Sequence, residues 1–162
     1  MKKYIKVICS CFVLLSVMLS IFSCGNKYKD DVKSETIANA VAEKLSVEGG
    51  YTVSDSDSFK YDFKEPSYVD DYIIMFAKSG TNMNRFGIFH VNDKKSVDDM
   101  KEIVTEYVEK YKTNFNYDYL PLENPKIEGG TVKTYGNYVV FMFLTDSDQT
   151  TAENQISELL NK

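Results

Sequence analysis

One segment of the sequence is apolar at every position over the length of a strand. Residues 138–144 read Tyr-Val-Val-Phe-Met-Phe-Leu. Side chains along a strand alternate between two faces, so an uninterrupted apolar run leaves no face for water. We therefore expect this segment to be a central strand, or a strand covered on both sides. The remaining elements must supply that cover.

Two pairs of strand-length runs surround turn signals. Gly136-Asn137 separates residues 131–135 from residues 138–145, and this two-residue turn tolerates the positive φ of a tight hairpin. Residues 72–77 and 86–91 flank a longer set of turn-forming residues, which predicts a second hairpin. Residues 51–69 are rich in Ser and Asp and contain a proline, so they predict a loop.

Three segments carry apolar residues at helical spacing. The first covers residues 34–45. The second begins at the predicted cap Ser96, with Asp99 at its third position, and continues to about residue 115. The third begins at Thr150, where Glu153 completes a capping box. The predicted order α-β-β-α-β-β-α describes an α+β domain with an antiparallel sheet of about four strands in two hairpins and three helices.

The first 23 residues differ from the rest. Three lysines open the chain, and the 16 residues from Val7 to Phe22 carry no charge and are apolar or small. A helix that spans a bilayer needs about 20 apolar residues. A basic start followed by a shorter apolar run is typical of a secretory signal peptide.

The end of this leader, Ile21-Phe22-Ser23-Cys24, resembles the bacterial lipobox. The resemblance implies signal cleavage after Ser23 and attachment of lipid, including palmitate, to Cys24. Two acyl chains would anchor the protein stably to the outer face of the cell membrane. The chain then divides into a signal peptide at 1–23, a lipidated cysteine and polar tether at 24–33, and a single α+β domain at 34–162. An ordinary signal peptide with an incidental thiol, or an uncleaved anchor, are the alternatives.

Removal of the leader changes what the composition implies. The mature chain would keep 162 − 23 = 139 residues and one cysteine, which cannot pair internally. Its formal charge would be 16 basic minus 24 acidic residues, or −8. This acidic balance argues against nucleic acid as a partner, because the phosphate backbone would repel it.

Few residues suggest chemistry. His90 is the only histidine, and its apolar neighbours favour a strand residue over a catalyst. Asp55 and Asp57 offer two oxygen ligands at alternate positions, but the glycine and the distant glutamate of a calcium loop are missing, so they are weak metal candidates. We therefore expect no catalytic residue, no metal and no cofactor.

Aromatic residues are numerous, with 12 Tyr and 10 Phe. Two groups of them could line a groove for a peptide or a sugar, although half-buried tyrosines on a sheet are the simpler explanation. The group that we select as possible binding residues is Tyr61, Phe63, Tyr68 and Tyr72. The second group is Tyr111, Phe115, Tyr117 and Tyr119.

The second half of the chain resembles a known family. The features that carry the resemblance are the segment 88–93, the long amphipathic helix, Tyr119-Leu120-Pro121 and Gly136-Asn137-Tyr138-Val139. In this order they resemble the uncharacterised clostridial lipoproteins grouped as domain of unknown function 4358, over about residues 35–161. Arg85 stands where the resemblance leads us to expect an acid, so a role of that acid would not carry over. The resemblance implies a bacterial surface lipoprotein and supplies no activity.

The sequence thus favours a membrane-anchored lipoprotein with a non-enzymatic, extracytoplasmic domain that binds an envelope protein or a peptide. One alternative is a carboxylate- or metal-dependent hydrolase, which predicts a deep pocket with two or more of Asp55, Asp57, Asp70 and Asp71. Another is an accessory structural subunit of an envelope complex, which predicts an exposed apolar patch, for example on the strand from Val139 to Leu144.

Overall fold

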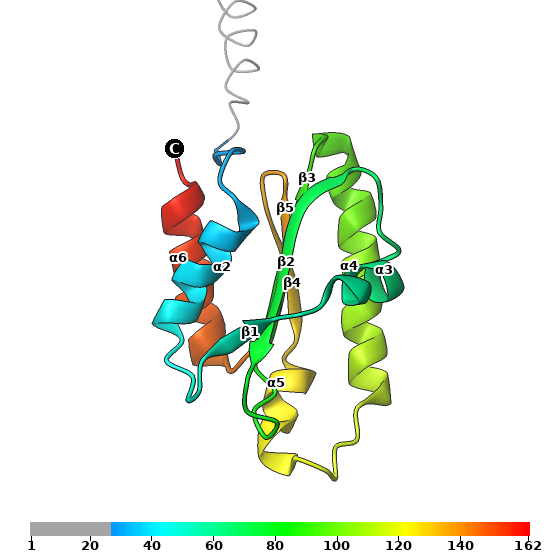
Figure 1. Cartoon of the computed structure of the whole chain (residues 1–162), viewed down its shortest axis with the longest axis vertical. Coiled ribbons are helices and arrows are strands. Elements are labelled where there is room, and N and C mark those ends of the chain that lie inside the picture. Colours follow the sequence, from blue (N-terminus) through cyan, green and yellow to red (C-terminus); the bar gives the residue numbers. More distant parts are fainter. Residues whose placement is uncertain (1–26) are drawn as a thin grey trace, which may run out of the picture.

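The computed structural model describes residues 27–162, so Ser23, Cys24 and the predicted signal peptide lie outside the described residues. One antiparallel sheet with the strand order β1-β2-β3-β5-β4 forms the centre of the domain (Figure 1). Its strands are β1 (Tyr51–Val53), β2 (Val69–Ala77), β3 (Arg85–Val91), β4 (Thr131–Tyr135) and β5 (Tyr138–Phe143). The α-helices are α2 (Ser34–Lys44), α3 (Ser56–Phe63), α4 (Val97–Asn114), α5 (Asn124–Glu128) and α6 (Asp146–Leu160).

The mixed α and β composition and the antiparallel sheet agree with the predicted fold. The number of elements does not, because the described chain has five strands and five α-helices where we predicted four strands and three helices. The segment 51–69, predicted as a loop, supplies strand β1 and helix α3. Helix α5 (Asn124–Glu128) forms in a segment for which we predicted no helix.

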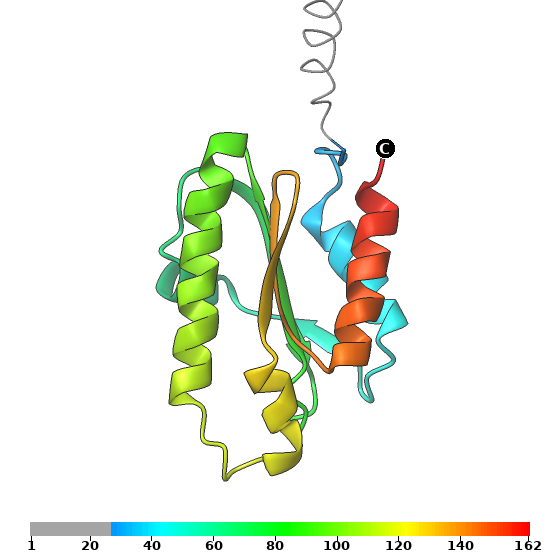
Figure 2. The same ribbon diagram turned by 180° about the vertical axis from the view of Figure 1, so that it is seen from behind.

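Helices cover both faces of the sheet. Helices α2 and α6 pack together on one face, and α3 and α4 lie on the other, as Figures 1 and 2 show from opposite sides. Each face has its own hydrophobic cluster. None of the helices within residues 27–162 has both the length and the apolar character that crossing a membrane requires.

Strand β5 occupies the position that its apolar run predicted. It lies between β3 and β4, and all six of its residues are buried. Tyr138, Val140 and Met142 belong to the cluster under α2 and α6, whereas Phe141 and Phe143 belong to the cluster under α4. The apolar patch predicted for an accessory subunit on this strand is therefore wrong, because helices already cover both of its faces.

The two predicted hairpins are confirmed. Strands β2 and β3 pair from Val69↔Val91 to Phe76↔Arg85. Strands β4 and β5 pair around the turn at Gly136, whose φ of 62° is in the left-handed region that favours glycine.

The predicted helices are present, but their capping contacts differ from the prediction. Ser96 is the N-cap residue of α4, as predicted, but its side chain makes no capping hydrogen bond, and the residue also ends a short 3₁₀ turn that the Asp93 carboxylate caps. Helix α6 begins four residues before Thr150, where the Thr145 hydroxyl accepts a hydrogen bond from the backbone N–H of Asp148 at 3.2 Å. Thr150 instead bonds back to the carbonyl of Asp146 within the helix.

Residues 27–33, which the sequence assigns to the tether, lie against one end of the domain. Tyr28 forms a β-bridge with Asn161, and the Tyr138 hydroxyl donates to the carbonyl of Val32 at 2.7 Å. The carboxylate of Asp30 accepts from the side chain of Asn137 at 3.0 Å. The chain therefore enters the domain at the end of the sheet that carries the β4–β5 turn.

Candidate functional site

Asp55 and Asp57, the weak metal candidates, lie at the start of helix α3. The Asp55 carboxylate caps this helix by accepting a hydrogen bond from the backbone N–H of Ser58 at 3.1 Å. Asp57 lies exposed in the first turn of the helix, where the helix dipole stabilises a negative charge. Residues 27–162 contain no cluster of three or more His, Cys, Asp or Glu residues that could hold a metal ion.

The first aromatic group does not form one surface. Phe63 is buried, with its ring centroid 4.5 Å from that of Tyr107, whereas Tyr61 is exposed to solvent. Tyr72 stacks on Phe59 with the ring centroids 3.9 Å apart. Tyr68 is half-buried against the cluster under α4. Phe63, on α3, and Tyr72, on β2, therefore help to hold helix α3 onto the sheet.

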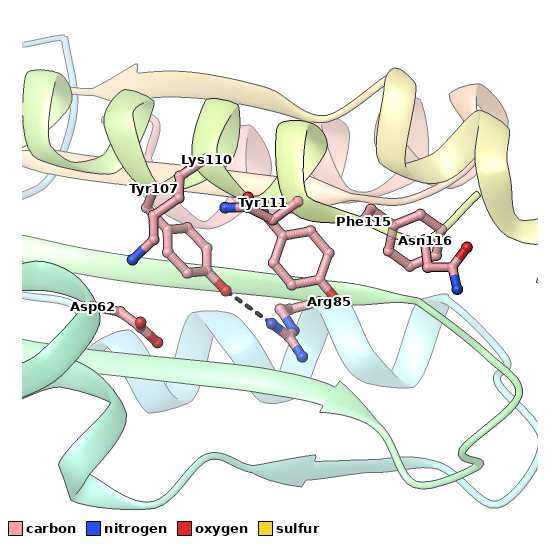
Figure 3. A pocket seen from close by; sticks show the side chains of 8 residues that line it. Asp62, Arg85, Tyr107, Lys110, Tyr111, Phe115 and Asn116 are labelled. Carbon is pink, nitrogen blue, oxygen red and sulfur yellow. Dashed lines mark hydrogen bonds between the residues drawn. The ribbon is translucent and has the colours of Figure 1, made fainter. Parts of the chain in front are cut away.

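Two members of the second aromatic group line a cavity beside Arg85, which we call the main cavity. Tyr111 and Phe115 line it, whereas the Tyr117 hydroxyl donates to the carbonyl of Lys112 and Tyr119 is exposed. The cavity measures about 360 Å³ and lies between α3, the start of β3 and the last turns of α4 (Figure 3). Its lining residues are Asp62, Arg85, Tyr107, Lys110, Tyr111, Asn114, Phe115 and Asn116.

Arg85 is the only arginine of the chain, beside 18 lysines. It opens strand β3, and its side chain lies on the same face as α4, in a row formed by the paired residues Phe76, Arg85 and Phe143. An Nη1 donor of the guanidinium bonds to the Tyr107 hydroxyl at 2.9 Å. The guanidinium also contacts two rings, at 4.9 Å from the centroid of Tyr111 and 5.8 Å from that of Phe76.

Arg85 keeps its charge in this half-buried position. Burial lowers the pKa of Arg85, but Tyr107, Tyr111 and Asp62 together raise it by more, so the pKa lies above its ordinary value. Burial also raises the pKa of Tyr107, by more than the neighbouring Arg85 lowers it, so this phenol stays neutral. Within the described chain, no carboxylate lies within 4.0 Å of the guanidinium, and Tyr107 is its only side-chain hydrogen-bond partner.

Two smaller cavities adjoin the main one at Arg85. One, of about 250 Å³, shares Asp62, Arg85 and Tyr107 with it and extends toward the start of α3. The other, of about 180 Å³, shares Arg85 and Tyr111 and extends toward the β2–β3 turn. We refer to these three cavities together as the Arg85 groove. Among residues 27–162, Arg85 is the one residue that lines all three cavities.

A separate polar cluster lies at the opposite end of β3. His90 Nδ1 is 2.6 Å from Asp70 Oδ1, and Nε2 is 3.0 Å from Asp30 Oδ1. Burial lowers the pKa of His90, but the two carboxylates raise it by more, so the pKa lies above its ordinary value. Asp71 accepts from the backbone N–H of Ser34 at 2.7 Å. The cluster borders a cavity of only about 150 Å³ and joins the entering segment and α2 to the sheet.

The acids named for a hydrolase are therefore split between two places. Asp70 and Asp71 line the small cavity beside His90, Asp55 lines part of the Arg85 groove, and Asp57 borders neither. Each of the first three accepts a hydrogen bond that stabilises the fold. This arrangement indicates that these carboxylates stabilise the fold, and it does not favour acid and base catalysis.

Comparison with known protein families gives a match. The family model described as "Domain of unknown function (DUF4358)" matches residues 51–144. The chain belongs to this family. No curated protein and no solved structure matches the sequence significantly.

The match places the Arg85 groove inside the DUF4358 domain. Residues 51–144 include all five strands and the helices α3, α4 and α5, and thus every residue that lines the groove. Helices α2 and α6 lie outside the matched range, although the sequence resemblance extended over both. The family match therefore covers the sheet and the helices on its α4 side, and does not cover helices α2 and α6 on the other side.

The sequence pointed to Arg85 only as a departure from an expected acid. Its uniqueness was a usable signal, because arginine suits planar recognition of anions and contacts with aromatic rings better than lysine does. The spacing of Tyr107, Tyr111 and Phe115 was also visible as a stripe on one helix. The sequence did not show that this end of the stripe passes over the start of β3.

Proposed function

We propose that this DUF4358 chain is a bacterial lipoprotein, anchored through Cys24 to the outer face of the cell membrane, whose domain binds a small molecule with a carboxylate group. The leader and the lipobox-like Ile21-Phe22-Ser23-Cys24 support the anchor. The entry of the chain at one end of the domain is consistent with attachment from that side.

One observation carries the binding proposal: the single arginine of the chain lines a cavity, charged and without a carboxylate partner among residues 27–162. A half-buried charge is costly unless an opposite charge or hydrogen-bond acceptors compensate it. Tyr107 uses only one of the five guanidinium donors. The remaining donors match the two oxygens of a carboxylate, which arginine binds in a bidentate manner.

The size and lining of the groove fit a small molecule. Its main cavity of about 360 Å³ falls in the range of ligand pockets, which are about 300–1,000 Å³ and are mostly apolar with a few polar groups. Tyr111 and Phe115 supply apolar wall, and Asn114 and Asn116 supply amide groups. We therefore favour a binding domain over the hydrolase.

The anchor is tested by replacement of its cysteine. Cys24→Ser should abolish incorporation of labelled palmitate and leave an unprocessed precursor. Cys9→Ser, in the leader, is the matched control and should leave labelling intact. Palmitate incorporation into the Cys24→Ser chain would contradict the anchor.

The binding site is tested with small carboxylates and their uncharged amides. Several carboxylates should raise the melting temperature of the wild-type protein, and their amides should not. Arg85→Gln should abolish the shift, whereas Lys95→Gln, which removes an exposed charge elsewhere, should retain it. A shift that persists in Arg85→Gln, or the lack of a shift with every carboxylate, would refute the site.

A further inference from the structure

We propose that the ligand of the Arg85 groove is an α-amino acid with an apolar side chain, held by its carboxylate at Arg85 and by its ammonium group at Asp62. This inference rests on the carboxylate site proposed above and adds the second charge and the side chain. It makes Asp62 a residue that determines specificity.

The first support is that charges of opposite sign line the same cavities without pairing. Asp62 on α3 and Arg85 on β3 both border the main cavity and its neighbour toward α3. Figure 3 shows the Asp62 carboxylate on the far side of Tyr107 from the guanidinium. Within residues 27–162, neither group forms an ion pair within 4.0 Å. Asp62 is exposed to solvent and contributes to the raised pKa of Arg85, so the two charges already interact across the cavity. A ligand with both charges would contact both groups, whereas a simple anion would contact Arg85 alone.

The second support is the charge sum of the main cavity. Its charged residues are Arg85, Lys110 and Asp62, which give a formal charge of +1. This positive sum attracts anions, but a phosphate monoester carries nearly two negative charges at neutral pH, which exceeds the sum, and it would also meet the carboxylate of Asp62. A zwitterion brings no net charge, and its two ends meet complementary groups. The lining therefore favours an amino acid over a phosphorylated ligand.

The third support is that the guanidinium of Arg85 has N–H donors left over in a restrained orientation. The rings of Tyr111 and Phe76 contact the guanidinium, and Tyr107 accepts from one Nη1 donor. These contacts restrain the orientation of the guanidinium and leave N–H groups for a planar acceptor. A carboxylate is such an acceptor, and bidentate binding would fix the orientation of the α-carbon that also bears the ammonium group.

The fourth support is the apolar wall next to these charges. Tyr111 and Phe115 stack with their ring centroids 6.1 Å apart along the last turns of α4. Both rings line the main cavity beside Arg85. An apolar or aromatic side chain that extends from the α-carbon would cover them and gain from the removal of apolar surface from water. This contact would explain why the cavity is larger than a carboxylate alone requires.

The experiment compares amino acids with analogues that lack one charge. The full-length chain, purified in detergent micelles, is titrated with L-phenylalanine, with 3-phenylpropionate, which lacks the ammonium group, and with 2-phenylethylammonium, which lacks the carboxylate. L-leucine and 4-methylpentanoate form a second pair with an aliphatic side chain. Binding is followed by ¹⁵N NMR shifts, and the wild-type protein should bind at least one amino acid more than about tenfold more tightly than either analogue.

Three variants assign the contributions. Asp62→Asn should weaken amino-acid binding by about tenfold and leave binding of the analogue without an ammonium group equal or tighter. Asp57→Asn, on the same helix but outside the groove, is the matched control and should leave both affinities unchanged. Arg85→Gln should abolish binding of both, and its NMR spectrum reports whether the fold is retained.

The outcomes separate this inference from the carboxylate site. If 3-phenylpropionate and 4-methylpentanoate bind as tightly as the amino acids and require Arg85, the amino-acid inference is overturned and the carboxylate site stands. The same conclusion follows if Asp62→Asn weakens the amino acids and their analogues equally. If no amino acid and no analogue binds the wild-type chain, both proposals fail together.

Discussion

The aromatic packing under α4 leaves no room for a side chain at Gly87. It lies in β3 directly opposite Phe141 of β5. A Cβ atom added at Gly87 would lie 2.3 Å from Cε1 of Phe141 and 3.0 Å from Cδ1. Carbon atoms in contact prefer about 3.5–4.0 Å. Gly87→Ala therefore requires the ring to move by 3.5 − 2.3 Å, or about 1.2 Å.

The ring of Phe141 has little room for such a movement. It is fully buried, and its centroid lies 5.1 Å from that of Tyr107, 5.9 Å from that of Phe143 and 6.2 Å from that of Phe89. Overpacking of a core costs about 1–3 kcal/mol. Alanine recovers about 0.5–1 kcal/mol over glycine inside a strand. Because the ring has little room to relax, the upper half of this range, about 2–3 kcal/mol, applies, and we expect Gly87→Ala to lower the free energy of unfolding by about 1–2.5 kcal/mol.

The assay is urea unfolding of residues 27–162, followed by circular dichroism, because both hydrophobic clusters are built from this segment. Gly80→Ala is the control, since a Cβ there meets no atom within 4 Å. In a Phe141→Leu background, Gly87→Ala should cost less than in the wild type by about 1 kcal/mol or more, because the clashing ring is gone. An equal cost in both backgrounds, or no cost in the wild type, would refute the reasoning.

Three further predictions concern single groups. Tyr107→Phe, which removes the acceptor of Arg85, should lower the free energy of unfolding by about 1–2 kcal/mol in urea unfolding, and an unchanged midpoint would contradict the importance of this bond. Thr145→Ala should lower the free energy of unfolding, measured in urea, by about 1 kcal/mol because it removes the cap of α6. Thr150→Ala should change that free energy by less than about 0.5 kcal/mol, and equal costs of the two substitutions would contradict the observed helix start. Because the pKa of His90 is raised in the fold, its bonds to the two carboxylates stabilise the fold below the ordinary pKa and weaken as the pH rises through the raised pKa. The melting temperature should therefore fall as the pH increases from about 6.5, and His90→Asn should remove that dependence. An equal slope of melting temperature against pH in both proteins would refute this prediction.

The sequence predicted the structure best where every residue of a segment was apolar. Strand β5 is apolar at each position, so no choice of register could expose it. Helix α3 was missed because only Phe59 and Phe63 mark its buried face, and a helix of eight residues shows too little periodicity among Ser and Asp. Strand β1 has only three residues, and pairing with β2 is what makes them a strand.

The start of α6 shows a different limit. Thr145 with Asp148 and Thr150 with Glu153 both have the spacing of a cap, and local sequence does not choose between them. The structure chooses the first because β5 ends at Phe143, and the helix must begin there to bury Ala152, Ile156 and Leu160. The tertiary position of a strand thus decides a helix boundary.

The Arg85 groove shows the same limit for a functional site. Its components were visible singly: a unique arginine at the start of an apolar strand, and tyrosines at four-residue spacing on a helix. The pairing of β3 with β5 and the packing of α4 on β5 bring these components together. No sequence pattern reports the angle of a helix over a sheet, so the groove required the structure.

The two polar centres of β3 lie at opposite ends of the strand, and this separation has a functional consequence. Arg85 and His90 are five residues apart, which corresponds to about 17 Å along an antiparallel strand. His90 binds Asp30 of the entering segment, only six residues after the proposed lipid attachment at Cys24.

A groove at the other end of β3 would then face away from the membrane and remain open to ligands. Because residues more than about 7–10 Å apart without shared partners act independently, we expect His90→Asn to leave the amino-acid affinity of the Arg85 groove unchanged within about twofold. A larger change in the NMR titration would show that the bonds at the point of chain entry are coupled to the groove, and that the two ends of β3 do not act separately.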